Sequence, residues 1–328
     1  MTSTIGETRL NDGAAHNFRN KSAAELWPPL AHFVVAEARL GQWASQRPAR
    51  RYLYEFLRFG IKQAWACLFG GIMIGLVLAT RLYYPPNAAL ARYDFLFLAG
   101  LGVQALLLLL RFESLQEASV IFLFHVVGTL MELFKTAHGS WVYPEPALFR
   151  LGGVPLFSGF MYACVGSYMM RAWDLFDFRF LRHPPLWQVA VLAAAIYANF
   201  FLHHYMMDMR FALFCASALI FAQTTICYRI HHNWRHMPLL LAAFLAASFI
   251  WIAENLATFS HIWLYPNQLW EWRPVGIGKL GAWFLLQIIS YALVALARRP
   301  AAPDDAPLLM SQARHRDRLS FRTDKQSS

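Results

Sequence analysis

The sequence predicts an all-α protein, a polytopic membrane helix bundle of about eight transmembrane helices arranged as a 4+4 parallel internal repeat. Hydrophobic residues make up 58% of the 328 residues and charged residues only 15%, whereas soluble domains average about 45–50% and about 25%. Apolar runs of about 20 residues also recur, and a helix needs this length to cross the hydrocarbon core. One motif with an ionisable residue occurs twice, which indicates the repeat.

The apolar runs define the expected elements, and we expect helices because the runs are long and do not alternate with polar residues. Residues 1–23 and 299–328 are predicted to be disordered tails, and residues 24–60 an amphipathic segment at the membrane surface. The transmembrane domain then covers residues 61–298, with repeat halves at 61–173 and 184–298. Its predicted spans are residues 63–82, 94–110, 116–135, 154–172, 186–203, 210–228, 237–256 and 276–297.

The distribution of positive charge predicts the orientation. Eight spans place both termini on one side, and assigning that side to the cytoplasm puts most Lys and Arg residues there. This agrees with the tendency of cytoplasmic segments to be positively charged, although the two long tails supply much of the excess. No apolar segment near the start resembles a cleaved signal peptide.

The repeated motif is a Glu at the end of an apolar run, followed nine residues later by Trp-x-Tyr-Pro. Its two copies begin at Glu132 and Glu254, which are 122 residues apart. An ionisable residue in a span is costly and usually faces the bundle interior, so these carboxyl groups are candidate functional groups. The equally weighted alternative is structural: each Glu accepts the Trp indole N–H and braces the following loop.

A second polar cluster lies between the fifth and sixth spans. His204 and Asp208 are four residues apart, a spacing that suits a metal site or a proton relay, although solvated histidines at a helix end are the stronger alternative. His and carboxylate ligands would suit zinc or iron, but the pattern assigns no metal and no cofactor. We take Glu132, Glu254 and His125 as candidate catalytic residues, and Trp141, Tyr143, Trp263, Tyr265, Asn255, His203, His204 and Asp208 as candidate lining of one outward-facing cavity.

Several stretches resemble a known family. They are Gly139–Pro146, Gly152–Tyr162, Asn199–His204 and Trp251–Asn255, and together they are similar to the bacterial domain-of-unknown-function 817 family over roughly residues 58–297. The resemblance implies a multi-pass protein of the bacterial inner membrane and no particular activity. A fainter resemblance, over one loop, is to carotenoid-hydratase-type membrane proteins.

Three functions fit these observations. The first is an enzyme that acts on an apolar lipid or isoprenoid, with Glu132 and Glu254 as a general acid–base pair. The second is a small-solute or proton-coupled transporter, since internal repeats are common in transporters. The third is a noncatalytic scaffold or sensor. Membrane lipid is the expected partner, no feature indicates nucleic acid, and the sequence leaves the oligomeric state open.

Overall fold

A computed structural model describes residues 43, 47–230 and 234–303. The chain divides into two compact units, residues 1–60 and 61–328, and the second contains the site discussed below. The predicted tail at residues 1–23 and nearly all of the predicted tail at 299–328 lie outside the described residues. Helix α4 (Pro48–Ala66) covers the described end of the predicted amphipathic segment, whose place at the membrane surface stays a prediction.

The chain is mainly helical, as predicted, and a helix occurs within each of the eight predicted spans. Two small antiparallel sheets accompany the helices: β1 (Arg150–Leu151) with β2 (Val154–Pro155), and β3 (Arg179–Leu181), β4 (Thr225–Arg229) and β5 (Trp234–Pro238) in the order β3-β4-β5. The helices that follow α4 are α5 (Leu68–Tyr83), α6 (Arg92–Leu109), α7 (Leu115–Ala137), α8 (Ser158–Leu175), α9 (Leu186–Leu202), α10 (Arg210–Phe221), α11 (Leu239–Phe259), the 3-10 helix η1 (Pro266–Gln268) and α12 (Gly278–Arg298).

Four of the described helices, α6, α7, α11 and α12, are long and apolar enough to cross a membrane. A fifth span results if α4 and α5 are taken together as one broken helix, while α9 and α10 are apolar but shorter. These helices support a membrane protein. The predicted sixth span, 210–228, is wrong at its C-terminal end, because the helix ends at Phe221 and Thr225–Arg229 pairs with strands on both sides.

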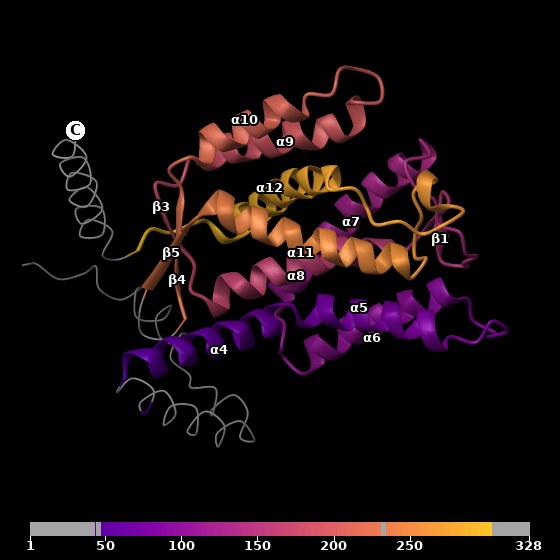
Figure 1. The fold of residues 1–328 in the computed structure, drawn as a ribbon, viewed down its shortest axis with the longest axis horizontal. Helices are drawn as coiled ribbons and strands as arrows, with labels where there is room; N and C mark the ends of the chain where they lie inside the picture. The colour runs from indigo at the N-terminus through magenta and orange to yellow at the C-terminus, as the bar shows by residue number, and fades with distance from the viewer. Residues whose placement is uncertain (1–42, 44–46, 231–233, 304–328) are drawn as a thin grey trace, which may run out of the picture. The chain divides into compact units, whose positions relative to one another are not determined.

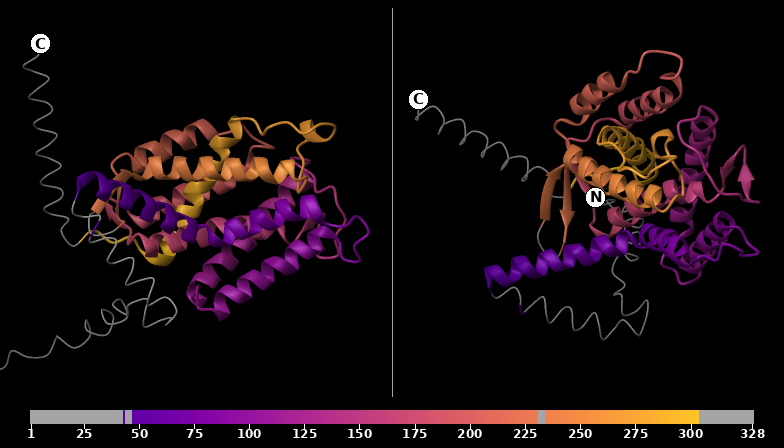
Figure 2. Two further views of the ribbon diagram at one scale, coloured as in Figure 1. Left: turned by 60° about the horizontal axis from the view of Figure 1, so that its bottom comes forward. Right: turned by 45° about the vertical axis from the view of Figure 1, so that its right-hand side comes forward.

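The loops and the larger sheet lie at opposite ends of the second unit (Figure 1). The connections α5–α6, α7–α8, α9–α10 and α11–α12 gather at one end, which we call the loop end, and β3, β4 and β5 lie at the other. Figure 2 shows the same separation from two further directions. Because α7 and α11 both run toward the loop end, the loops that follow them can meet.

Helix α12 forms the centre of the second unit. It contacts α7, α8, α9, α10 and α11, and Ile288, Val294 and Ala295 on it are fully buried. Figure 1 shows it between the α9–α10 pair and α11. In a membrane, such close packing rather than exclusion of water holds helices together, so α12 positions the helices around it.

Helices α7 and α8 approach each other closely because glycines face bulky rings. A Cβ atom at Gly128 would lie 2.3 Å from the Tyr162 ring, and one at Gly159 would lie 2.5 Å from the His125 ring. Small residues at helix interfaces allow this approach. It directs Tyr162 of α8 toward the end of α7, where Glu132 lies.

Candidate functional site

Helices α7 and α11 end in the same backbone turn. The residue two positions after the last helical residue has a positive φ in both, +66° at Gly139 and +55° at His261. The next amide donates to a carbonyl five residues earlier, Ser140 to Lys135 and Ile262 to Ala257, at 3.0 and 3.1 Å. This is the hydrogen-bond pattern of a glycine-type helix C-cap. The two segments that follow α7 and α11 therefore leave their helices in the same way.

The two loops then pair with each other through Val142 and Leu264. Each backbone N–H donates to the other residue's carbonyl at 2.9 Å, which forms an isolated antiparallel bridge. These residues are 122 positions apart, the offset between the two motif copies. A reciprocal antiparallel pair is unchanged when its two residues are exchanged, so the two copies meet at equivalent points.

The first copy of the motif encloses its carboxylate. Three side chains donate to Glu132, each at 2.7 Å: the Trp141 indole and the Tyr143 hydroxyl to Oε2, and the Tyr162 hydroxyl to Oε1. Glu132 is only 3% exposed. The Trp141 contact is the one that the loop-bracing alternative requires, and Glu132 joins α7, its loop and α8.

The second copy engages its carboxylate differently. The Tyr265 hydroxyl, the counterpart of that of Tyr143, donates to Glu254 Oε1 at 2.5 Å. The second donor is the Trp283 indole of α12, at 2.7 Å from Oε2. Trp263 packs instead in a buried apolar cluster. With two donors rather than three, Glu254 also lines a cavity.

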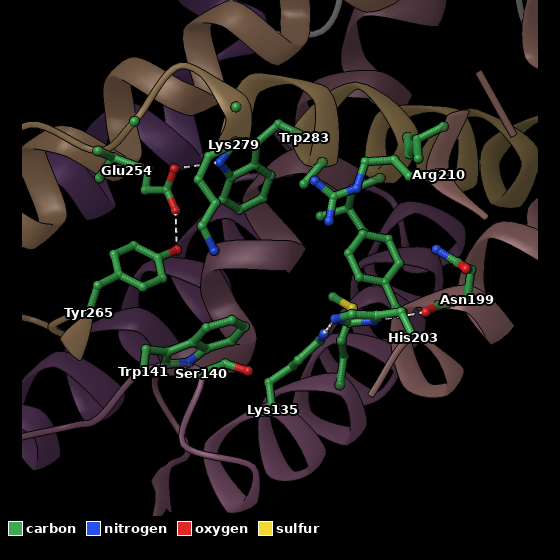
Figure 3. A pocket seen from close by; sticks show the side chains of 18 of the residues that line it. Lys135, Ser140, Trp141, Asn199, His203, Arg210, Glu254, Tyr265, Lys279 and Trp283 are labelled. Carbon is green, nitrogen blue, oxygen red and sulfur yellow. Dashed lines mark hydrogen bonds between the residues drawn. The ribbon is translucent and has the colours of Figure 1, made fainter. Parts of the chain in front are cut away.

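This cavity has a volume of about 570 Å³ and opens among α7, α9, α10, α11 and α12 at the loop end. Figure 3 shows Lys135, Arg210 and Lys279 pointing into it from three helices. Glu254 is the one carboxylate among its described lining residues. Aromatic and aliphatic side chains complete the wall, including Trp141, Tyr162, Tyr265, Trp283, Phe200 and Leu285.

The cations have few anionic partners. Lys279 Nζ lies 4.3 Å from the ring centroid of Tyr265 and 5.8 Å from that of Trp141, and no hydrogen-bond acceptor for it occurs among the described residues. Aromatic faces attract such a cation but accept no strong hydrogen bond from it. Arg210 pairs with Asp208 at 3.0 Å. Both side chains are more than a third exposed, at 39% and 37%.

Lys135 lies beside histidines rather than beside an acid. Its Nζ is 3.2 Å from Nε2 of both His203 and His204, and the His138 ring is 4.9 Å from that of His204 between centroids. Loss of solvation and the nearby positive charge of Lys135 lower the pKa of His204, with further contributions from His203 and His138. No group of three His, Cys, Asp or Glu side chains in the described ranges is arranged to hold a metal ion.

Four of the candidate residues line the cavity: Trp141, Glu254, Tyr265 and His203. Two lie behind its wall, since Glu132 and Tyr143 are buried and bonded to each other. His204 and Asp208 contact the lining residues Lys135 and Arg210 without lining the cavity.

Three candidates have other positions. His125 lies in the α7–α8 interface, 5.0 Å from the Phe160 ring between centroids, and its Nδ1 has no partner among the described residues. Trp263 packs in the apolar core. Asn255 braces a loop, because its Oδ1 accepts from the Val275 N–H at 2.9 Å. The predicted single cavity thus contains only part of the predicted set.

Sequence reasoning missed the cationic residues. Lys135 lies three positions after Glu132 and so near it on α7, which was an available signal. Arg210 and Lys279 stand at or next to the first residue of α10 and α12, and nothing local directs them to one point. Tyr162 and Trp283 come from the helices that follow each loop, so only the packing of those helices identifies them.

Comparison with known proteins agrees with the resemblance noted in the sequence. The family model described as "Protein of unknown function (DUF817)" matches residues 55–291. The chain is 41% identical over 245 residues to the uncharacterized protein YoaT of Bacillus subtilis (strain 168), which covers 75% of this chain and 92% of that relative. No solved structure matches. The chain therefore belongs to the DUF817 family.

Proposed function

We propose that this protein is a membrane protein that binds a small organic anion in the cavity at its loop end. One observation carries the proposal: among the described residues, Lys279 enters the cavity with no hydrogen-bond acceptor and no carboxylate within ion-pair distance, while Glu254 accepts from two neutral donors. Lys135, which also lines the cavity, contacts two histidines rather than an acid. A partly buried cation is unfavourable unless an anion or hydrogen-bond acceptors compensate it. A bound anion would supply both.

The walls indicate the rest of the ligand. Phe200, Leu285 and Ile196 give the cavity an apolar side, so a ligand with a hydrocarbon portion would fill it better than a simple inorganic ion. The volume of about 570 Å³ lies within the range of about 300–1,000 Å³ that is usual for small-molecule sites. The proposed ligand therefore has an anionic head and an apolar part.

This proposal favours binding over acid–base catalysis by the two glutamates. Glu132 accepts three hydrogen bonds and does not line the cavity, so a ligand there would not reach it. Anion binding is a step that a transporter and a lipid-modifying enzyme share.

The proposed membrane arrangement is eight spans in two parallel four-helix repeats, in a bacterial inner membrane with both termini cytoplasmic. The order of helices supports it: α5 to α8 and α9 to α12 begin at residues 68, 92, 115 and 158, and at 186, 210, 239 and 278. The shared turn and the Val142–Leu264 bridge support it further. The cavity would then face outward. A reporter fused after residue 303 that works only in the cytoplasm tests the orientation.

Thermal unfolding of the purified full-length protein in detergent tests anion binding. Decanoate and decyl phosphate should raise the unfolding temperature, whereas decanol and decylamine at equal concentration should not, because a ligand stabilises only the state that it binds. Lys279→Gln should weaken the anion affinity by about tenfold or more. Equal stabilisation by the neutral or cationic compounds would contradict the proposal.

Arg273→Gln is the matched control. Arg273 is a cation on the same α11–α12 connection, its side chain is 69% exposed, and it does not line the cavity. This substitution should leave the anion affinity unchanged. Equal losses in Lys279→Gln and Arg273→Gln would show that a general surface charge, and not the cavity, attracts the anion.

A further inference from the structure

The two copies of the motif differ at the residue that follows Trp-x-Tyr-Pro. The first copy continues with Glu145 and the second with Asn267, again 122 positions apart. One loop therefore carries a carboxylate at this point, and the other carries a shorter, neutral amide.

In the first copy the carboxylate of Glu145 neutralises an arginine. Arg92, the first residue of α6, places its Nη2 2.6 Å from Oε1 and its Nε 2.9 Å from Oε2 of Glu145. This two-pronged geometry is the strongest form of an Arg–carboxylate contact. Arg92 Nη2 also donates to the backbone carbonyls of Ser260 and His261 in the other loop, at 3.1 and 3.2 Å. The arginine is thus compensated within the chain.

In the second copy the corresponding carboxylate is missing. Arg210 is the first residue of α10, as Arg92 is of α6, and both Arg210 and Asn267 line the cavity. Asn267 brings no charge to the place where Glu145 stands in the first copy. The exposed Asp208 pairs with Arg210 from the same turn, and Lys135 and Lys279 add two further positive charges.

We infer that the ligand is a carboxylate, and that its carboxylate group occupies in the second copy the position that the Glu145 side chain occupies in the first. The inference rests on the proposed anion-binding function and narrows its ligand class. In the first copy the group that pairs with the arginine is the carboxylate of Glu145. A carboxylate is planar, and its two oxygens match the two-pronged guanidinium group. The carboxylate belongs to a fatty acid or to a short water-soluble acid.

Affinity measurements with the wild-type protein test the head group without any variant. Octanoate, octyl phosphate, octanesulfonate and acetate are compared in detergent by thermal shift and by calorimetry. Octanoate should bind at least about tenfold more tightly than octyl phosphate and octanesulfonate. Equal or tighter binding of phosphate or sulfonate would overturn the carboxylate inference and leave anion binding intact, whereas no binding by any of the four would overturn both.

The comparison of octanoate with acetate separates the two sources of a carboxylate. Tighter binding of octanoate indicates a lipid-like acid, since the apolar side of the cavity would then contribute. Equal binding indicates a short water-soluble acid and would contradict the apolar part of the proposed ligand. Both results support the carboxylate head group, provided that the phosphate and the sulfonate bind more weakly.

Asn267→Glu tests the position of the carboxylate. It supplies the internal carboxylate of the first copy, so it should raise the unfolding temperature without ligand and weaken octanoate binding by about tenfold or more. Asn267→Gln separates charge from size, because it has the length of Glu without the charge, and it should weaken octanoate binding clearly less than Asn267→Glu does. Wild-type octanoate affinity in a folded Asn267→Glu variant would overturn the inference.

Discussion

The two copies of the motif have the same backbone turn but differ in how their charged side chains are paired. At Glu132 three neutral donors surround the carboxylate, and the neighbouring Arg92 is paired with Glu145. At Glu254 only two donors contact the carboxylate, and Arg210, Lys135 and Lys279 face a cavity. In the first copy, both Glu132 and Arg92 have their partners within the chain. The second places three cations, Lys135, Arg210 and Lys279, near two carboxylates, Asp208 and Glu254, so its described residues carry an excess of positive charge.

Asp94 shows how the first loop is closed. Its carboxylate accepts backbone hydrogen bonds from Leu148 at 3.0 and 2.8 Å and from Phe149 at 2.9 Å, and the side chain is fully buried. Asp94 lies two residues after the start of α6, and the residue at this place on α10 is Ala212. Alanine cannot accept these hydrogen bonds, so the second loop lacks this brace.

The largest expected effect is at the two glutamates. Glu132→Ala leaves three buried donors, on Trp141, Tyr143 and Tyr162, without their acceptor. It should therefore lower the free energy of unfolding by about 3–5 kcal/mol. Glu254→Ala should cost about half as much, because solvent entering the cavity can solvate Tyr265 and Trp283. Denaturant or thermal unfolding of both variants in one detergent measures the difference. Equal losses would show that the two glutamates contribute equally to stability, despite their different numbers of donors.

The second comparison uses the two arginine partners. Glu145→Gln leaves the buried Arg92 without its carboxylate and should cost about 1–3 kcal/mol, because the partly exposed Glu145 is replaced by a side chain that can still accept a hydrogen bond. Asp208→Asn removes the partner of the exposed Arg210 and should cost less than about 1 kcal/mol, since exposed ion pairs contribute little. Unfolding without added anion gives both values. A larger loss for Asp208→Asn than for Glu145→Gln would mean that Arg210, and not Arg92, depends more on its carboxylate partner.

Substitutions at the positive-φ residues after α7 and α11 should have smaller effects on stability, with opposite signs. Gly139→Ala places a side chain at a positive φ and should lower stability by about 1 kcal/mol. His261→Gly relieves the same conformation at the equivalent turn and should raise stability by up to about 1 kcal/mol. Thermal unfolding of both variants measures the pair. Destabilisation by His261→Gly would mean that the His261 side chain contributes more than its backbone conformation costs.

The smallest expected effect is the dependence on pH. Loss of solvation and the positive charges of Lys135, His203 and His138 lower the pKa of His204, while loss of solvation and the charges of Arg81 and Arg92 lower that of His261. At these two positions the unfolded chain therefore binds more protons, and their contribution to stability should fall as the pH drops below about 6.5.

Unfolding temperatures at pH 7.5 and 5.5 measure this dependence, and His204→Gln and His261→Gln should each reduce it. A steeper loss of stability toward acid in both variants than in the wild type would contradict the signs of the two shifts.

Part of the fold and of the site could be predicted from local sequence. Long apolar runs located eight helices, because helix formation depends on composition over a few turns. The loop-bracing alternative agrees with the first copy, in which Trp141 donates to Glu132, but not with the second, in which Trp263 packs in an apolar cluster. By contrast, the apolar run at 210–228 concealed strand β4, because pairing with β3 and β5 decided its conformation. Tyr162 and Trp283 could not be predicted, since their contacts depend on how α8 and α12 pack.

By itself the sequence determined a helical chain rich in apolar segments, a duplicated Glu–Trp-x-Tyr-Pro motif and membership of the DUF817 family. It also shows that the two copies differ at Glu145 and Asn267, but not what this difference does. Only the tertiary structure decided that, by bringing Glu145 onto Arg92 in one copy and Lys135, Arg210 and Lys279 around a cavity in the other. The physical reason is that the balance of charge at a site is a sum over side chains from distant helices, which no local stretch of sequence contains.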